Sequence, residues 1–170
     1  MGVGGFYQPG YRKRTKMHLK MMCLGKNWDP HIPPEFHTLV SNALRDANAL
    51  IPHNPLPSVS PDICIVNFYS QTGHLGLHQD NYESEDSLRR GLPVVSFSIG
   101  HSAPFLYGDH RDPDKAEKLL LESGDVLIFG GPSRNVFHGV SAIHPATAPE
   151  ILLQHTNLCP SRLNLTFRQY

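Results

Sequence analysis

The chain has 170 residues, with 15 Lys and Arg against 15 Asp and Glu, and 39% of it is hydrophobic. This length suits one domain with a substantial core. Cys23, Cys64 and Cys159 form no Cys-X-X-Cys pair, which argues against a disulfide framework or a zinc knuckle and favours an intracellular compartment: nucleus, cytoplasm or mitochondrion. No apolar run approaches the roughly 20 residues that cross a bilayer, so we expect a protein outside the membrane. We also expect a monomer.

Basic residues are concentrated near the N-terminus. The first 28 residues contain no Asp or Glu, and such an asymmetry indicates contact with phosphate groups. A solvated basic arm explains the charge equally well. The basic residues are Arg12, Lys13, Arg14, Lys16, Lys20 and Lys26.

Residues 1–61 are expected to form an N-terminal lid and helical support region. Apolar residues recur at three- and four-residue steps from Phe36 to Leu50, which predicts an amphipathic helix that ends before Pro52. The rest of this region is rich in Gly and Pro and is expected to be largely irregular. Its other predicted elements are a strand at 16–24, a turn at 27–30 and a loop at 51–61.

From residue 62 to 170 the pattern changes to short apolar runs bounded by Gly, Pro, Asp and Ser. Such runs are typical of strands in a sandwich or barrel. The chain is therefore predicted to be mainly β, a double-stranded β-helix (jelly roll) with a flanking helix. Residues 82–90 are expected to be an exposed loop. The predicted strands are 63–69, 75–78, 94–100, 103–107, 118–121, 126–130, 136–140 and 162–167.

A possible metal site begins at His78-Gln79-Asp80. Residues two apart on a strand project to the same side, so His78 and Asp80 could bind one ion. With His138, brought in by the fold from 58 residues further on, they would make the two-imidazole, one-carboxylate set that leaves positions open on Fe(II). A surface loop also produces His-X-Asp by chance.

The stretch 162–168 reads as a strand with two distinct faces. Leu163, Leu165 and Phe167 are assigned to the core between two sheets. The opposite row carries two guanidinium groups, which suit a dicarboxylate, although an ordinary solvent-facing polar row has the same alternation. Asn67 and Tyr69 repeat this spacing and could donate hydrogen bonds to a carboxylate. The polar row consists of Arg162, Asn164, Thr166 and Arg168.

Taken in order, these motifs resemble the AlkB family of Fe(II)- and 2-oxoglutarate-dependent dioxygenases. The resemblance runs from about residue 4 to residue 170. The stretches 4–11 and 22–30 look like the subfamily of the first AlkB homologue, in its plant-like form. The motifs that carry the family resemblance are Asn67-Phe68-Tyr69, His78-Gln79-Asp80, Ser133-Arg134 before His138, and Arg162-Leu163-Asn164-Leu165-Thr166-Phe167-Arg168.

The resemblance implies an enzyme that uses Fe(II), 2-oxoglutarate and O2. It would demethylate N6-methyladenine in DNA or 1-methyladenine in RNA or DNA, either single-stranded or with the base flipped out, and release succinate, CO2 and formaldehyde. The alternatives are a 2-oxoglutarate dioxygenase acting on a protein side chain or small molecule, and a catalytically silent nucleic-acid-binding module. By resemblance, Fe(II) is assigned to His78, Asp80 and His138, and 2-oxoglutarate to Asn67, Tyr69, Arg162, Asn164, Thr166 and Arg168.

The residues that would contact the nucleic acid are less well defined by the resemblance. Where the founding bacterial pattern has Lys and Asp after the His-X-Asp motif, this chain has Asn81 and Tyr82. Arg134 is expected near the base pocket, unless it is a structural arginine of its turn. The full set of predicted substrate contacts is Arg134, Tyr82, Trp28, Arg12, Lys13 and Arg14.

Overall fold

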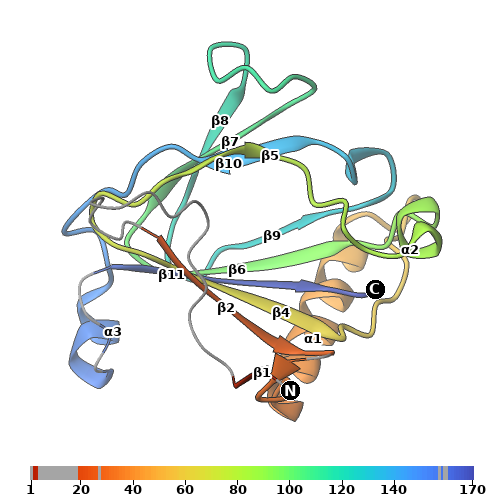
Figure 1. The fold of residues 1–170 in the computed structure, drawn as a ribbon, viewed down its shortest axis with the longest axis horizontal. Helices are drawn as coiled ribbons and strands as arrows, with labels where there is room; N and C mark the ends of the chain where they lie inside the picture. The colour runs from red at the N-terminus through yellow and green to blue at the C-terminus, as the bar shows by residue number, and fades with distance from the viewer. Residues whose placement is uncertain (1, 4–18, 27, 157, 159–160) are drawn as a thin grey trace.

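Two β-sheets face each other in the structure, a computed structural model that describes residues 2–3, 19–26, 28–156, 158 and 161–170 (Figure 1). The larger sheet has the strand order β1-β3-β2-β4-β11-β6-β9 and the smaller one β5-β10-β7-β8. The strands are β1 (Gly2–Val3), β2 (Leu19–Gly25), β3 (Trp28–Asp29), β4 (Ile63–Tyr69), β5 (Leu75–His78), β6 (Val94–Gly100), β7 (Ala103–Gly108), β8 (Glu117–Leu121), β9 (Val126–Phe129), β10 (Phe137–Val140) and β11 (Arg162–Arg168). The helices are α1 (Pro34–Leu50), α2 (Glu85–Arg89), the 3-10 turn η1 (Gly131–Ser133) and α3 (Glu150–His155).

Strand β11 lies at the middle of the larger sheet, between β4 and β6. In the antiparallel register Asn164 is opposite Asn67 on β4 and opposite Ser98 on β6. Because side chains alternate along each strand, this register gathers the polar residues of three strands on one face of the sheet. That face is turned toward the smaller sheet.

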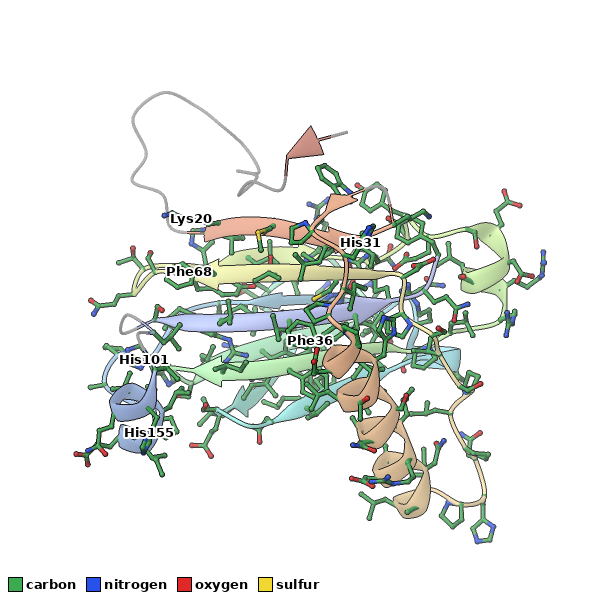
Figure 2. All side chains as sticks on the ribbon, turned by 90° about the horizontal axis from the view of Figure 1, so that it is seen from below. Lys20, His31, Phe36, Phe68, His101 and His155 are labelled. Atoms are coloured by element: carbon green, nitrogen blue, oxygen red, sulfur yellow. The ribbon has the colours of Figure 1, made fainter. Side chains whose placement is uncertain are left out.

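The opposite face of the larger sheet is apolar and is covered by α1 (Figure 2). Prolines fit the first turn of a helix, where an N–H has no partner, and α1 begins at Pro34. Phe167 is fully buried, and its ring meets those of Phe36 on α1 and Phe97 on β6 edge to face, with centroids 5.6 and 5.7 Å apart. The prediction that Leu163, Leu165 and Phe167 fill the space between the sheets is therefore wrong: they pack under the helix.

The loop predicted for residues 82–90 is wrong over 85–89, which form α2, although most of the segment is exposed as predicted. Ser84 caps α2, its hydroxyl accepting a hydrogen bond from the Ser87 N–H. Glu83, just before the cap, is buried. Two short elements also differ from the prediction, because the expected turn at 27–30 contributes β3 to the larger sheet and α3 was not predicted.

The described residues contain no helix that is long and apolar enough to span a bilayer. Cys23 and Cys64 are free thiols, and Cys159 lies outside the described residues. Burial raises the pKa of the Cys64 thiol to about 12, so this thiol stays protonated and unreactive at neutral pH.

Replacing Phe167 by alanine tests the role of the core under α1. Phe167→Ala should lower the free energy of unfolding by about 3 to 5 kcal/mol, because it removes a fully buried ring and leaves a cavity. Leu120→Ala on edge strand β8, where the side chain is half exposed, should cost less than about 1 kcal/mol. Urea unfolding of both variants measures the difference, and equal losses would contradict this placement of the core.

Candidate metal and co-substrate site

The two candidate histidines meet because β5 and β10 are paired. His138 is directly opposite His78 in the antiparallel register, which brings together residues far apart in the sequence. Gly139 permits this close pairing, since a Cβ there would lie 2.5 Å from the carbonyl oxygen of Leu75. Asp80 lies two residues after the end of β5, and its carboxylate is grouped with the two imidazoles.

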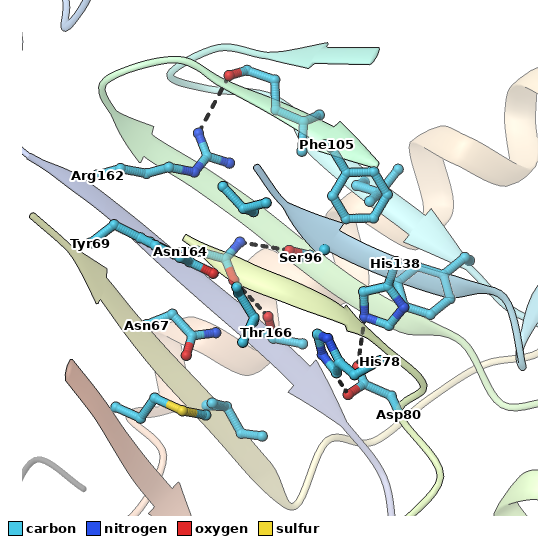
Figure 3. A pocket seen from close by; sticks show the side chains of 18 of the residues that line it. Asn67, Tyr69, His78, Asp80, Ser96, Phe105, His138, Arg162, Asn164 and Thr166 are labelled. Carbon is cyan, nitrogen blue, oxygen red and sulfur yellow. Dashed lines mark hydrogen bonds and ion pairs between the residues drawn. The ribbon is translucent and has the colours of Figure 1, made fainter. Parts of the chain in front are cut away.

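His78, Asp80 and His138 form one cluster, with ligand atoms all within 4.8 Å of one another (Figure 3). The Nε2 of His78 lies 3.8 Å from Asp80 Oδ1, and the Nε2 of His138 lies 3.6 Å from Oδ2. Asp80 and His138 are buried, whereas His78 is partly open to solvent. It is the only such group of three among the residues that the structure describes.

Backbone hydrogen bonds set the tautomer of both imidazoles. Each Nδ1 lies against a carbonyl two residues earlier: His78 against Gly76 at 2.9 Å, and His138 against Val136 at 3.1 Å. A carbonyl only accepts, so each Nδ1 must carry the proton and donate. The lone pair is therefore on Nε2, which faces Asp80, and this is how metal-binding histidines are oriented in proteins.

Charges around the cluster favour metal-binding protonation states. Burial alone would raise the pKa of Asp80, but the adjacent imidazole of His138 and the charge of Arg168 outweigh burial and lower the pKa from 3.8 to about 2. Burial, followed by the neighbouring His138, lowers the pKa of His78. At neutral pH the site thus holds an ionised carboxylate beside a neutral His78 imidazole.

The cluster lies in a pocket between the sheets that encloses about 580 Å³, part of it open to solvent (Figure 3). The smaller sheet contributes Phe105 and Val140 to its wall. The larger sheet contributes polar side chains from β4, β6 and β11, together with Leu127 and Phe129 of β9. The pocket therefore has a polar wall and an apolar wall around the three candidate ligands.

Arg162 is the deepest cation of this pocket, with 1% of its surface exposed. Its guanidinium donates to Ser98 Oγ at 2.6 Å and to the His101 carbonyl at 3.1 Å. None of the ion pairs between described residues includes it, and its buried Nε has no partner. A buried cation without a counter-charge is costly, so this end of the pocket suits an anion.

The other predicted polar residues line the same pocket. Asn164 Nδ2 donates to Ser96 Oγ at 2.6 Å, and Thr166 Oγ1 donates to Asn164 Oδ1 at 2.8 Å, so these two are tied to each other and to β6. Asn67 has a buried amide oxygen without a partner. Burial raises the pKa of the Tyr69 phenol, and the charge of Arg162 offsets this effect only in part. The phenol therefore stays protonated at neutral pH and can donate a hydrogen bond.

The two remaining arginines of the prediction are engaged within the protein. Arg168 lines the pocket but pairs with Asp80 Oδ1 at 3.1 Å and Glu83 Oε1 at 3.0 Å. Arg134 is buried, pairs with Glu83 at 2.8 Å and is not on the pocket wall. The structure thus gives Arg134 the position of a structural arginine of its turn.

The other predicted substrate contacts lie outside the pocket. Tyr82 is 81% exposed, two residues after Asp80, and Trp28 on β3 is 44% exposed. Neither is on the pocket wall. Arg12, Lys13 and Arg14 lie outside the described residues.

Three residues of the site were missed by the sequence analysis. Ser96 and Ser98 hold Asn164 and Arg162, and their next-but-one spacing on a predicted strand was a signal of a shared face. Glu83 lies among charged residues of a segment that looked solvent-exposed, and nothing in the sequence marks it as the buried one.

Comparison with known protein families matches residues 2–168 to the 2OG-Fe(II) oxygenase superfamily. An Arabidopsis thaliana protein named DNA N(6)-methyladenine demethylase ALKBH1C is 60% identical over all of this chain, which covers 43% of that protein. A Schizosaccharomyces pombe protein named tRNA demethylase abh1 is 38% identical over 64% of this chain and 36% of its own length. The chain thus spans less than half the length of these relatives.

Among solved structures, that of OsALKBH1 is 54% identical and superimposes with a TM-score of 0.90, over 99% of this chain and 86% of that one. This likeness confirms the double-stranded β-helix expected from the sequence. The chain belongs to the 2OG-Fe(II) oxygenase superfamily and, within it, to the AlkB family.

Proposed function

We propose that the chain is a dioxygenase that uses Fe(II), 2-oxoglutarate and O2 to remove N-methyl groups from nucleobases of DNA or RNA. One observation carries the proposal: a cluster of two imidazoles and one carboxylate shares a pocket with the unpaired guanidinium of Arg162. The names of the two relatives, a DNA N(6)-methyladenine demethylase and a tRNA demethylase, support a nucleic-acid substrate.

His78, Asp80 and His138 fit Fe(II) by the chemistry of their donor atoms. Two Nε2 lone pairs and an ionised carboxylate make a three-ligand set, and such a set leaves positions open for a co-substrate and oxygen. The backbone carbonyls that fix each Nδ1 hold the rings in place before a metal arrives.

Arg162 and its neighbours fit the far carboxylate of 2-oxoglutarate. A guanidinium binds a carboxylate through charge-assisted hydrogen bonds, and Arg162 has a buried Nε without a partner. The Tyr69 phenol can donate to the same group. The Asn67 amide can do so too, since a half-turn exchanges its unpartnered oxygen for its NH2 group.

When bound, the iron, 2-oxoglutarate and O2 would supply the oxidation that hydroxylates a methyl carbon, after which the adduct releases formaldehyde and succinate is left. The protein's own residues bind and orient. Arg168 keeps the Asp80 carboxylate ionised, and Phe105, Phe129 and Val140 form an apolar wall that limits water around the reacting groups.

A nucleobase must leave its stack to enter a pocket between two sheets, so the substrate is expected to be single-stranded or to have its base flipped out. We propose that Tyr82, which is exposed two residues after Asp80, stacks on a base or its neighbour. We propose that Arg12, Lys13 and Arg14 contact phosphates, with an affinity that falls as the salt concentration rises.

The direct test is mass spectrometry of nucleosides after incubation with Fe(II), 2-oxoglutarate and ascorbate. The panel contains DNA with N6-methyladenine, RNA with 1-methyladenine, their unmethylated counterparts and generic peptides. We expect loss of a methylated nucleoside together with succinate release. Succinate release with peptides alone would favour an oxygenase of protein side chains, and loss of no methylated nucleoside would overturn the demethylase proposal.

Exchange of single histidines tests the metal assignment. His78→Ala should abolish succinate release and weaken binding of Mn(II), a redox-inert probe of the iron site, because it removes one of three ligands. His74→Ala is the matched control, since His74 is exposed, lies four residues earlier and is outside the cluster. Unchanged succinate release by His78→Ala would refute the assignment.

Replacing Arg162 tests the 2-oxoglutarate assignment. Arg162→Gln should weaken 2-oxoglutarate binding by at least about tenfold, because a charge-assisted hydrogen bond is lost, and should leave Mn(II) binding intact. Arg89→Gln, which removes an exposed guanidinium from α2, should affect neither. Isothermal titration calorimetry measures both affinities, and an unchanged 2-oxoglutarate affinity for Arg162→Gln would place the co-substrate elsewhere.

A further inference from the structure

Glu83 is a buried carboxylate that the proposed reaction does not use. Its side chain has no exposed surface, and one oxygen, Oε1, lies 2.8 Å from Arg134 Nη2 and 3.0 Å from Arg168 Nη1. The other oxygen, Oε2, has no hydrogen-bond partner. A lone carboxylate at this depth is stable only beside positive charge, so Glu83 depends on the two arginines and they on it.

Arg168 connects Glu83 to the candidate metal ligand Asp80. One terminal nitrogen, Nη1, contacts Glu83, and the other, Nη2, lies 3.1 Å from Asp80 Oδ1. The two carboxylates therefore share one guanidinium from opposite ends. The electrostatic attraction between Arg168 and Asp80 therefore depends on the competing attraction between Arg168 and Glu83.

Arg134 holds Glu83 in place from the loop that leads to β10. Its Nε donates to the Leu92 carbonyl at 3.1 Å, and its Nη1 donates to the backbone carbonyl of Asp80. With these contacts it joins the segment after β5, the segment after α2 and the loop four residues before His138. Glu83 is thereby fixed at a defined position relative to Asp80.

The charges of this network balance: two carboxylates face two guanidinium groups. Loss of the Glu83 charge would leave Arg168 free to pair fully with Asp80. A divalent cation would then compete with Arg168 for that carboxylate and would also meet an extra unit of positive charge. A dianionic co-substrate would meet an equally or more favourable field.

We propose that Glu83 is a positioning residue of the metal centre. Arg134 fixes Glu83, which competes with Asp80 for the Arg168 guanidinium and so keeps the Asp80 carboxylate available to a divalent cation. The inference rests on the proposed metal site at His78, Asp80 and His138. It separates two properties of the pocket, because Glu83 should support metal binding without supporting 2-oxoglutarate binding.

Mn(II) titration of the metal-free chain tests this separation. Glu83→Gln keeps the shape of the side chain and removes its charge, and it should raise the Kd for Mn(II) by about tenfold or more, the usual effect of residues behind metal ligands. On Mn(II)-saturated protein the Kd for 2-oxoglutarate should change by less than about threefold or become lower, since Arg162 is untouched. Glu83→Asp, which keeps the charge, should recover most of the Mn(II) affinity.

Glu85→Gln is the matched control, because it removes an exposed negative charge two residues away that makes none of the ion pairs between described residues. It should bind Mn(II) as the unaltered chain does. Unchanged Mn(II) affinity in Glu83→Gln would overturn the proposal. Equal weakening of Mn(II) and 2-oxoglutarate binding would also overturn it, since that result indicates general loosening of the pocket.

A comparison in the Arg168→Gln background keeps the proposal testable if Glu83→Gln does not fold. Because Glu83 is proposed to act through Arg168, the proteins Arg168→Gln and Glu83→Gln/Arg168→Gln should bind Mn(II) within about threefold of each other. A difference of about tenfold between them would overturn the proposal. If the unaltered chain and His78→Ala bind Mn(II) equally, the proposed metal site itself is wrong, which is a separate result.

Discussion

The space between the two sheets is occupied by charged side chains, and their burial constrains the rest of the structure. Three arginines and two carboxylates are buried on or behind the wall of one pocket. Charges removed from water are tolerated only when they are paired and hydrogen-bonded. Four of the five are paired by the network of Asp80, Glu83, Arg134 and Arg168, which leaves Arg162 as the one without a carboxylate partner among the described residues. The unpaired positive charge of Arg162 therefore marks the end of the pocket that can bind an anion.

Because buried charges take up much of the space between the sheets, most of the apolar core has to lie elsewhere. In this chain the larger of the two apolar clusters lies on the outer face of the larger sheet, where α1 covers Leu165, Phe167 and the neighbouring side chains of β4 and β6. The stability of the fold and the chemistry of the pocket are thus carried by opposite faces of the same strands. Each strand of this region alternates between them: in β11, Arg162 and Asn164 face the pocket while Leu163 and Leu165 face the helix.

This division explains which predictions from the sequence succeeded. The bounds of β4 and β5 were predicted correctly because alternation and turn residues mark strands locally. Alternation also showed which residues share a face, and so it grouped Arg162 with Asn164. It could not show which face lies inside, because both faces are covered here, and the apolar row was assigned to the wrong side. Glu83 was missed because its burial depends on two arginines that are 51 and 85 residues away in the sequence.

In the segment from Asp80 to Glu83, buried ion pairs at both ends hold two exposed residues in place. Its two ends are buried carboxylates, Asp80 and Glu83, and its two middle residues, Asn81 and Tyr82, are exposed. Arg168 contacts both ends, and Arg134 holds the backbone of one end and the side chain of the other. With both ends fixed, the two middle residues have little freedom to move relative to the candidate metal ligands. The segment can therefore carry different exposed side chains while the positions of the candidate ligands are kept, so residues 81 and 82 are where we propose that the choice of substrate can change without loss of the candidate metal site.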